Sequence, residues 1–261
     1  MESPRPERPT RVVLLVAGGE LAAAVVNALH QAFPDLIVLE EDAEGKWAIL
    51  RRRVRLLGPL PAVGQALGGV LFKLIARLSR PRLAEIHRDG RLDMRANPHA
   101  ARRYVGNVNS EPCRNALVAL APQVVAVYGT RILSAATLAS VKAPFINYHA
   151  GINPKYRGQQ PGYWAMREGD AEHAGVTIHL VDRGVDTGDV LHQARVAFTS
   201  ADNITTYQHV QMVTALPLFI RAIEEALDGR LAPRRVDLPS RQWFPPTLWS
   251  YLFGGIARGV W

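Results

Sequence analysis

A chain of 261 residues, 48% of them hydrophobic, can bury one large core or two small ones. Its mean hydropathy of -0.02 excludes a disordered chain. The net charge of +8, from 31 Lys and Arg against 23 Asp and Glu, suggests phosphate-bearing partners but carries no information about the fold. The single cysteine, Cys113, excludes an internal disulfide framework and a thiolate zinc cluster, and it fits a cytoplasmic location.

The basic excess is confined to one segment. Residues 46–103 hold fourteen Lys and Arg and three acids, a net of +11, which leaves 17 basic and 20 acidic residues elsewhere, a net of −3. The segment opens with Arg51-Arg52-Arg53-Val54-Arg55 and continues into an apolar helix expected over about 62–78. Three interpretations stay open: a solvated helical insertion, a phosphate-binding flap for a substrate, or attachment to an anionic membrane surface.

Two stretches could be mistaken for membrane-directed segments. Arg5, Arg8 and Arg11 precede an apolar run that stops after six residues at Gly18-Gly19, which is short for a signal peptide and typical of a buried strand. The longest uncharged stretch, 56–72, contains two prolines and four glycines and is a poor membrane span.

The elements expected in the first half alternate in type. Residues 11–17 are typical of a buried strand, 21–33 of a helix and 36–39 of a second strand, so the chain begins with a βαβ unit and a parallel sheet. After the basic segment we expect a helix at 115–120, a strand at 123–128, a short helix at 135–140 and a strand entered at 143–147.

The second half changes in pattern. Residues 175–181 and 190–196 are expected to be two strands, compatible with an antiparallel pair, and Asn203 can cap a helix that runs to about Leu227. The last 33 residues, 229–261, are too aromatic for a free tail and should pack on the chain's own core or on another subunit. The fold class is therefore α/β, a Rossmann-like, doubly wound and mostly parallel sheet with a basic helical insertion and a C-terminal extension.

Residues 145–189 concentrate the groups that can carry chemistry. A strand delivers Asn147 and His149 to its carboxyl end, where open parallel sheets bind ligands, and their spacing of two residues puts both on one face. The amide can stabilise an oxyanion while the imidazole moves a proton, and a carboxylate from the later Asp-rich loop can orient the imidazole. A metal site built from His179, His192, Asp182, Asp186 and Asp189 is a weaker alternative because no compact ligand motif is present.

Two separated motifs resemble the signature of the folate-dependent formyltransferases. They are Asn147-Tyr-His-Ala-Gly-Ile-Asn-Pro-Lys-Tyr-Arg-Gly158 and His179-Leu-Val-Asp-Arg-Gly-Val-Asp-Thr-Gly188. That family includes glycinamide ribonucleotide transformylase, methionyl-tRNA formyltransferase and sugar-nucleotide N-formyltransferases. The resemblance covers roughly residues 104–228. It implies a catalytic domain over 1–228, with the insertion at about 46–103, and an extension over 229–261.

The resemblance also implies roles for individual residues. Asn147 would stabilise the oxyanion, His149 would transfer protons, and Asp186 would organise the imidazole. The co-substrate would be N10-formyltetrahydrofolate, with no metal, held by the backbone of Arg131, Ile132 and Leu133 and by Val181 and Asp182. Lys155, Tyr156 and Arg157 are either part of a solvated loop or shape the entrance.

The acceptor is approached by comparison within the resemblance. Glu20, in the turn after the first strand, would repel the phosphate of glycinamide ribonucleotide, and the residues after Gly229 are too few for the C-terminal barrel of methionyl-tRNA formyltransferase. We therefore expect a small amine acceptor bearing a phosphate or nucleotide, such as an amino sugar. Glycinamide ribonucleotide, water (a formyltetrahydrofolate hydrolase) and a non-catalytic basic binding module remain alternatives. Nucleic acid is not an expected partner. Contact with a membrane surface through the insertion, and a homodimer through the extension, are further hypotheses.

Overall fold

The computed structural model describes residues 12–19 and 21–261, so Arg5, Arg8, Arg11 and Glu20 lie outside the described part of the chain. A seven-stranded sheet, in the order β3-β2-β1-β4-β5-β7-β8, forms its centre. The strands are β1 (Val12–Ala17), β2 (Ile37–Glu41), β3 (Ala101–Gly106), β4 (Val124–Tyr128), β5 (Phe145–His149), β7 (Gly175–Leu180) and β8 (Val190–Arg195). The first five run parallel, and β7 and β8 are antiparallel additions at one edge. The predicted mostly parallel sheet and antiparallel pair are both confirmed.

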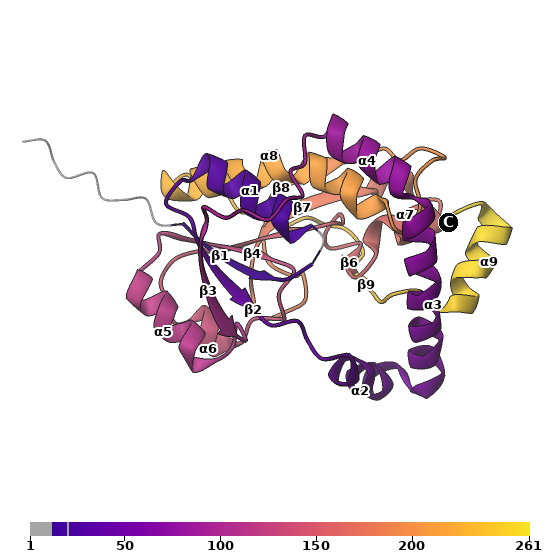
Figure 1. The fold of residues 1–261 in the computed structure, drawn as a ribbon, viewed down its shortest axis with the longest axis horizontal. Coiled ribbons are helices and arrows are strands. Elements are labelled where there is room, and N and C mark those ends of the chain that lie inside the picture. The colour runs from indigo at the N-terminus through magenta and orange to yellow at the C-terminus, as the bar shows by residue number, and fades with distance from the viewer. Residues whose placement is uncertain (1–11, 20) are drawn as a thin grey trace, which may run out of the picture.

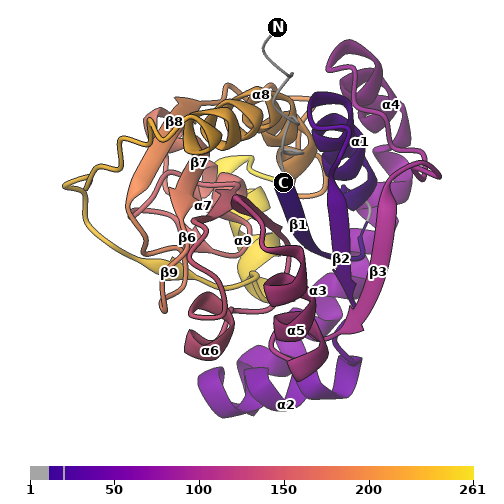
Figure 2. The ribbon, with the colours of Figure 1, turned by 90° about the vertical axis from the view of Figure 1, so that its left-hand side faces the viewer.

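Helices cover both faces of this sheet, which makes it doubly wound (Figures 1 and 2). The long helix α8 (Tyr207–Leu227) and α1 (Ala22–Ala32) lie on one face, and α5 (Glu111–Leu120) and α6 (Ala135–Leu138) lie on the other. Successive residues of β1 alternate between the two cores: Leu14 packs with α1 and α8, and Leu15 packs with α5. Helix α8 begins at Tyr207, later than expected, because Asn203 accepts the Thr205 N–H in the preceding turn.

The basic segment forms three helices, α2 (Lys46–Leu57), α3 (Pro59–Leu78) and α4 (Arg80–Asp89). In Figure 1, α3 stands at the right-hand end of the molecule with α2 at its foot. The last part of the interval given to the insertion, residues 101–103, lies in β3 and therefore belongs to the sheet. By length and hydropathy, α3 is the one helix in the described part of the chain that could cross a membrane, and 22% of its most apolar 18-residue stretch is buried.

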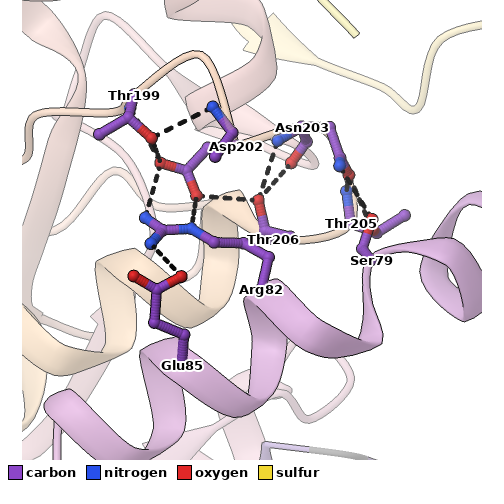
Figure 3. A network of polar contacts seen from close by, with 9 residues as sticks. Ser79, Arg82, Glu85, Thr199, Asp202, Asn203, Thr205 and Thr206 are labelled. Atoms are coloured by element: carbon purple, nitrogen blue, oxygen red, sulfur yellow. Dashed lines mark hydrogen bonds and ion pairs between the residues drawn. The ribbon is translucent and has the colours of Figure 1, made fainter.

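A polar network fixes the junction between α3 and α4 to the segment before α8 (Figure 3). Arg82 forms two hydrogen bonds to the carboxylate of Asp202, of 2.9 and 3.1 Å, and also pairs with Glu85 at 3.0 Å. The Asp202 side chain is fully buried, and Asn203 donates to the Ser79 hydroxyl at 2.9 Å. The basic segment is therefore held to the rest of the fold by an ion pair whose carboxylate is fully buried.

The C-terminal segment packs on its own chain. Its short strand β9 (Gln242–Trp243) pairs with β6 (Arg157–Gly158), and α9 (Leu248–Arg258) lies against α3. Trp243 stacks on Trp164 of α7 (Pro161–Arg167) with ring centroids 4.6 Å apart, and the Tyr251 ring is fully buried. A one-turn 3₁₀ helix, Ala171–His173, completes the elements. Of the two packing alternatives for this segment, the structure shows the chain's own core.

Candidate active site

Asn147 and His149 lie at the carboxyl end of β5, on the same face of the sheet. The antiparallel pairing of β5 with β7 sets Asn147 directly opposite His179. His179 donates its Nδ1 hydrogen to the Leu180 carbonyl at 2.8 Å, so its Nε2 accepts a hydrogen bond from Asn147 Nδ2 at 3.1 Å. One of the two amide hydrogens of Asn147 is thereby fixed, and the other is free to point into the adjoining cavity.

The imidazole of His149 is buried and held through one nitrogen. Its Nε2 donates to the Tyr156 carbonyl at 2.7 Å, which leaves Nδ1 as the nitrogen that can take up or release a proton. The hydrogen bond between His149 and Tyr156 requires a glycine at position 151, because a Cβ there would come within 2.4 Å of the Tyr156 oxygen and 2.7 Å of His149 Nε2. No side chain other than hydrogen fits at position 151 without moving the imidazole.

Asp186 lies on the loop between β7 and β8 and faces both imidazoles. Its carboxylate is 3.4 Å from His149 Nδ1 and 3.6 Å from His179 Nε2, and it accepts the Gly158 N–H at 2.9 Å. Burial alone would raise its pKa, but the two imidazoles and the Gly158 N–H outweigh it and hold the pKa well below the ordinary value. Its φ of +52° is a conformation that aspartate tolerates better than most residues. A charged carboxylate is thus kept beside His149 Nδ1.

These three side chains open into one cavity of about 330 Å³, a size typical of cofactor-binding pockets. The five residues predicted to hold the pterin also line it: Arg131, Ile132, Leu133, Val181 and Asp182. The Arg131 backbone N–H donates a hydrogen bond to the Glu41 carboxylate at 2.7 Å, and the Val181 N–H donates to the Phe145 carbonyl. These two bonds hold the backbone on both sides of the cavity in place. All eight predicted site residues therefore surround the same space, and their roles remain predictions.

A second cavity, of about 580 Å³, adjoins the first and shares the 129–132 segment, Gly158, Gln159 and Val185 with it. Its opposite wall is α2, which contributes Arg52 and Arg53. Arg52 pairs with Glu44 at 2.7 Å, while burial and the neighbouring Arg52 lower the pKa of Arg53. Glu41, Asp42 and Glu44 line the same cavity, and Glu41 and Glu44 pair with Arg131 and Arg52, which leaves Arg53 as the arginine of this wall that an anionic group could neutralise.

The other residues singled out by the sequence lie elsewhere. Lys155 and Tyr156 both contact Asp170, and Arg157 donates to the Val185 carbonyl at 2.8 Å, supporting the loop that carries Asp186. His192 pairs with Glu225 on α8 instead of facing the cavity. The described residues contain no group of three or more His, Cys, Asp or Glu side chains that could hold a metal ion.

The sequence did not assign His179 to the catalytic group, nor did it identify Gly151 as a steric requirement. An explicit pairing of the strands at 145–149 and 175–180 would have placed His179 opposite Asn147. Cys113, by contrast, lies on the buried side of α5, where burial raises its pKa to about 11, in agreement with its interpretation as a core residue.

An α/β fold with these motifs at the carboxyl edge of its sheet defines a class of group-transfer enzymes. The family model described as formyl transferase matches residues 88–223, and the chain belongs to that family. The resemblance drawn from the two motifs, and with it the prediction of a folate-dependent formyltransferase enzyme, is confirmed at the level of the family.

Individual relatives differ in what they are named for. A methionyl-tRNA formyltransferase of Pelotomaculum thermopropionicum is 38% identical over 129 residues, 49% of this chain and 40% of that protein. The chain spans less than half the length of these curated relatives. A sugar N-formyltransferase from Shewanella sp. FDAARGOS_354 superposes with a TM-score of 0.55 at 16% identity, over 90% of this chain and 77% of that one.

A formyltransferase from Anoxybacillus kamchatkensis, solved with tetrahydrofolate and a UDP-linked formamido sugar, gives a TM-score of 0.51 at 18% identity, over 89% and 85% of the two chains. At these identities the structural likeness establishes the shared fold and leaves the acceptor to be decided by chemistry.

Proposed function

We propose that the protein transfers the formyl group of N10-formyltetrahydrofolate to a primary amine on a small acceptor that bears a phosphate or nucleotide, such as an amino sugar. The observation that carries the proposal is the convergence of Asn147, His149 and Asp186 on one cavity, beside a second cavity walled by Arg52 and Arg53. The folate and UDP-sugar bound in the Anoxybacillus relative support the same pair of ligands.

The cavity residues fit the folate donor. The exposed side chain of Ile132 and the backbone of the 131–133 segment offer an apolar and hydrogen-bonding wall for a pterin ring. Bound N10-formyltetrahydrofolate would supply the one-carbon group: its bond from carbon to N10 breaks as the acceptor nitrogen bonds to that carbon. The residues of this chain then have to stabilise the oxygen that becomes negative and to move one proton from the amine to N10.

Asn147 supplies the oxyanion donor through its free amide hydrogen, because the other is bound to His179. His149 Nδ1 takes the proton that the attacking amine loses, and the Asp186 carboxylate 3.4 Å away stabilises the imidazolium that forms. The same nitrogen returns the proton to the departing folate nitrogen. Since Nε2 is bonded to the Tyr156 carbonyl, the ring cannot turn away between these two steps.

A panel of acceptors tests the proposal. Purified protein is given N10-formyltetrahydrofolate with nucleotide-linked amino sugars, glycinamide ribonucleotide, charged initiator tRNA, or no amine, and tetrahydrofolate release is measured. We expect formylation of an amino sugar. Preference for glycinamide ribonucleotide would assign the enzyme to that acceptor, release without any amine would make it a hydrolase, and failure to bind folate would make it a basic binding module.

A second candidate acceptor, methionyl-tRNA, follows from the 38% identity to the Pelotomaculum enzyme. Substitutions in α2 distinguish the two candidate acceptors. We expect Arg53→Gln to raise KM for a phosphate-bearing acceptor about tenfold and to leave KM for folate unchanged. Arg51→Gln, on the exposed side of the same helix, is the matched control. An equal effect of both substitutions would indicate a diffuse tRNA contact.

The predicted cytoplasmic location is part of this proposal, and the predicted homodimer through the C-terminal extension is the alternative to a lipid contact at that surface. Support for the location comes from Cys113, a thiol buried at 0% exposure that has no disulfide partner. Cell fractionation and sedimentation velocity test the two statements directly.

A further inference from the structure

The exposed side of α3 is unusually apolar for a helix on the outside of a domain. Six large aliphatic side chains along it are between 47% and 74% exposed, at a spacing of three or four residues: Leu60, Val63, Leu67, Val70, Leu74 and Leu78. At 3.6 residues per turn they fall within an arc of about 80°. We call this row the α3 stripe. It does not face the protein core, so the stability of the domain does not account for it.

Helix α9 extends the same apolar surface. Trp249, Leu252, Phe253 and Ile256 are between 39% and 80% exposed and occupy one side of α9, while Tyr251, Gly254 and Gly255 are buried. The Trp249 ring joins the two helices: it lies over Gly64, where a Cβ would come within 2.3 Å of it. The α3 stripe and the exposed side of α9 therefore belong to neighbouring, packed helices, which stand together at one end of the molecule (Figure 1).

The charged side chains within α2, α3 and α9 all have one sign. Residues 46–78 contain seven Lys and Arg and no acid, and α9 contains Arg258 and no acid. Lys73 and Arg77 are exposed on the edge of α3 next to the stripe, and Arg51 and Arg55 are exposed on α2 at its foot. Burying this surface against a second copy would bring cations together without acids in these segments to pair them.

We propose that the α3 stripe and the exposed side of α9 bind the surface of an anionic phospholipid bilayer. Amphipathic helices with apolar and aromatic side chains on one side and Lys or Arg beside them lie in the interface plane, where lipid phosphates neutralise the cations. This inference does not depend on the identity of the formyl acceptor.

The other side of α3 shows why the helix lies on the bilayer and does not cross it. Gly64, Gln65 and Gly68 are buried against the C-terminal segment, and the Gln65 amide donates to the Pro245 carbonyl at 2.9 Å. The Arg82–Asp202 pair fixes its carboxyl end to the catalytic domain. Spanning would break these contacts and place Lys73 and Arg77 in hydrocarbon.

Vesicle flotation of the full chain tests the proposal, with vesicles of phosphatidylcholine alone and vesicles in which about a third of the lipid is phosphatidylglycerol. We expect binding to the anionic vesicles that weakens as salt rises. Leu67→Glu and Phe253→Glu should each lower the partition coefficient about tenfold. Neutralising Lys73 and Arg77 together should lower it about 25-fold at low salt, at about 1 kcal/mol for each cation.

Matched controls lie at the other end of the molecule. Val118→Glu on α5, at a site 59% exposed, and Arg103→Gln on β3 should leave vesicle binding unchanged. Thermal unfolding of every variant checks that the fold is intact. The proposal is overturned if anionic vesicles are not bound, if the α5 control loses binding equally, or if Leu67→Glu instead abolishes self-association or RNA binding of a protein that ignores lipid.

Discussion

The hydrogen bond between Asn147 and His179 makes a quantitative prediction about catalysis. Asn147→Ala removes the one amide hydrogen that is free to face the developing oxyanion, because the other is bound to His179 Nε2 at 3.1 Å. Loss of one preorganised oxyanion donor costs about 10²–10³ in kcat, equivalent to about 2.7–4 kcal/mol of transition-state stabilisation. KM for folate should change little, since the residues expected to hold the pterin, 131–133, are left intact in the same cavity.

His179→Ala should cost less, about tenfold, because the amide then keeps its second hydrogen but loses the contact that fixes its direction. The double variant gives the decisive comparison. If His179 acts only through Asn147, the double variant will be as slow as Asn147→Ala alone. The coupling energy between the two substitutions will then be equal in size and opposite in sign to the effect of His179→Ala alone.

The assay is the initial rate of tetrahydrofolate release at saturating acceptor, with kcat and KM determined separately. His192→Ala is the control, because that histidine pairs with Glu225 away from the cavity and should leave kcat near the wild-type value. A reduction in kcat of the double variant that equals the product of the two single reductions would show that His179 contributes independently of Asn147. An Asn147→Ala enzyme with nearly full kcat would refute the oxyanion role.

Three further changes test the structure around the site. Gly151→Ala should lower kcat at least about tenfold while the protein stays folded, because its Cβ displaces His149; circular dichroism with the rate assay separates the two effects. Arg82→Met should lower the free energy of unfolding by about 3 kcal/mol, measured in urea, since it leaves the buried Asp202 carboxylate without its cation. Burial and the neighbouring His87 imidazole lower the pKa of His209 from 6.5 to about 4. Between these two pH values the unfolded chain binds a proton that the folded chain does not. The free energy of unfolding therefore decreases by up to about 3 kcal/mol as the pH falls from 6.5 to about 4. His209→Gln should flatten this dependence in urea titrations at several pH values, and an unchanged slope would contradict the assignment.

The sequence located most accurately the strands that are buried on both faces of the sheet. The strands β1 and β4 are nearly continuous apolar runs and β5 begins with two apolar residues, and each was located to within one or two residues. β3 was missed because it is an edge strand, Ala101–Gly106, in which Val105 is the one buried residue, so no apolar pattern marks it.

The site shows the same division between local and long-range information. Asn147 and His149 could be placed together because two residues of one strand share a face. The contact of Asn147 with His179 depends on strand register, and the steric role of Gly151 depends on a carbonyl five residues away that the loop folds back. Helix α9 was foreseen as an aromatic packed segment and not as a helix, because Gly254 and Gly255 weaken the helical pattern while permitting close contact with Tyr163 and Trp261.

The packing of α9 on α3 also sets an order of events during synthesis. The two helices are separated by roughly 170 residues, which take about 10–30 s to translate, so α3 leaves the ribosome long before the helix that covers Gly64 and Gly68 exists. During that interval the side of α3 that later packs on α9 is open to chaperones, to lipid or to other nascent chains, while α2, which is made earlier, can already pack on α3. A chain interrupted before Leu248 would keep that side of α3 uncovered permanently, and such a truncated product should be insoluble even where the motifs around Asn147 and Asp186 are intact.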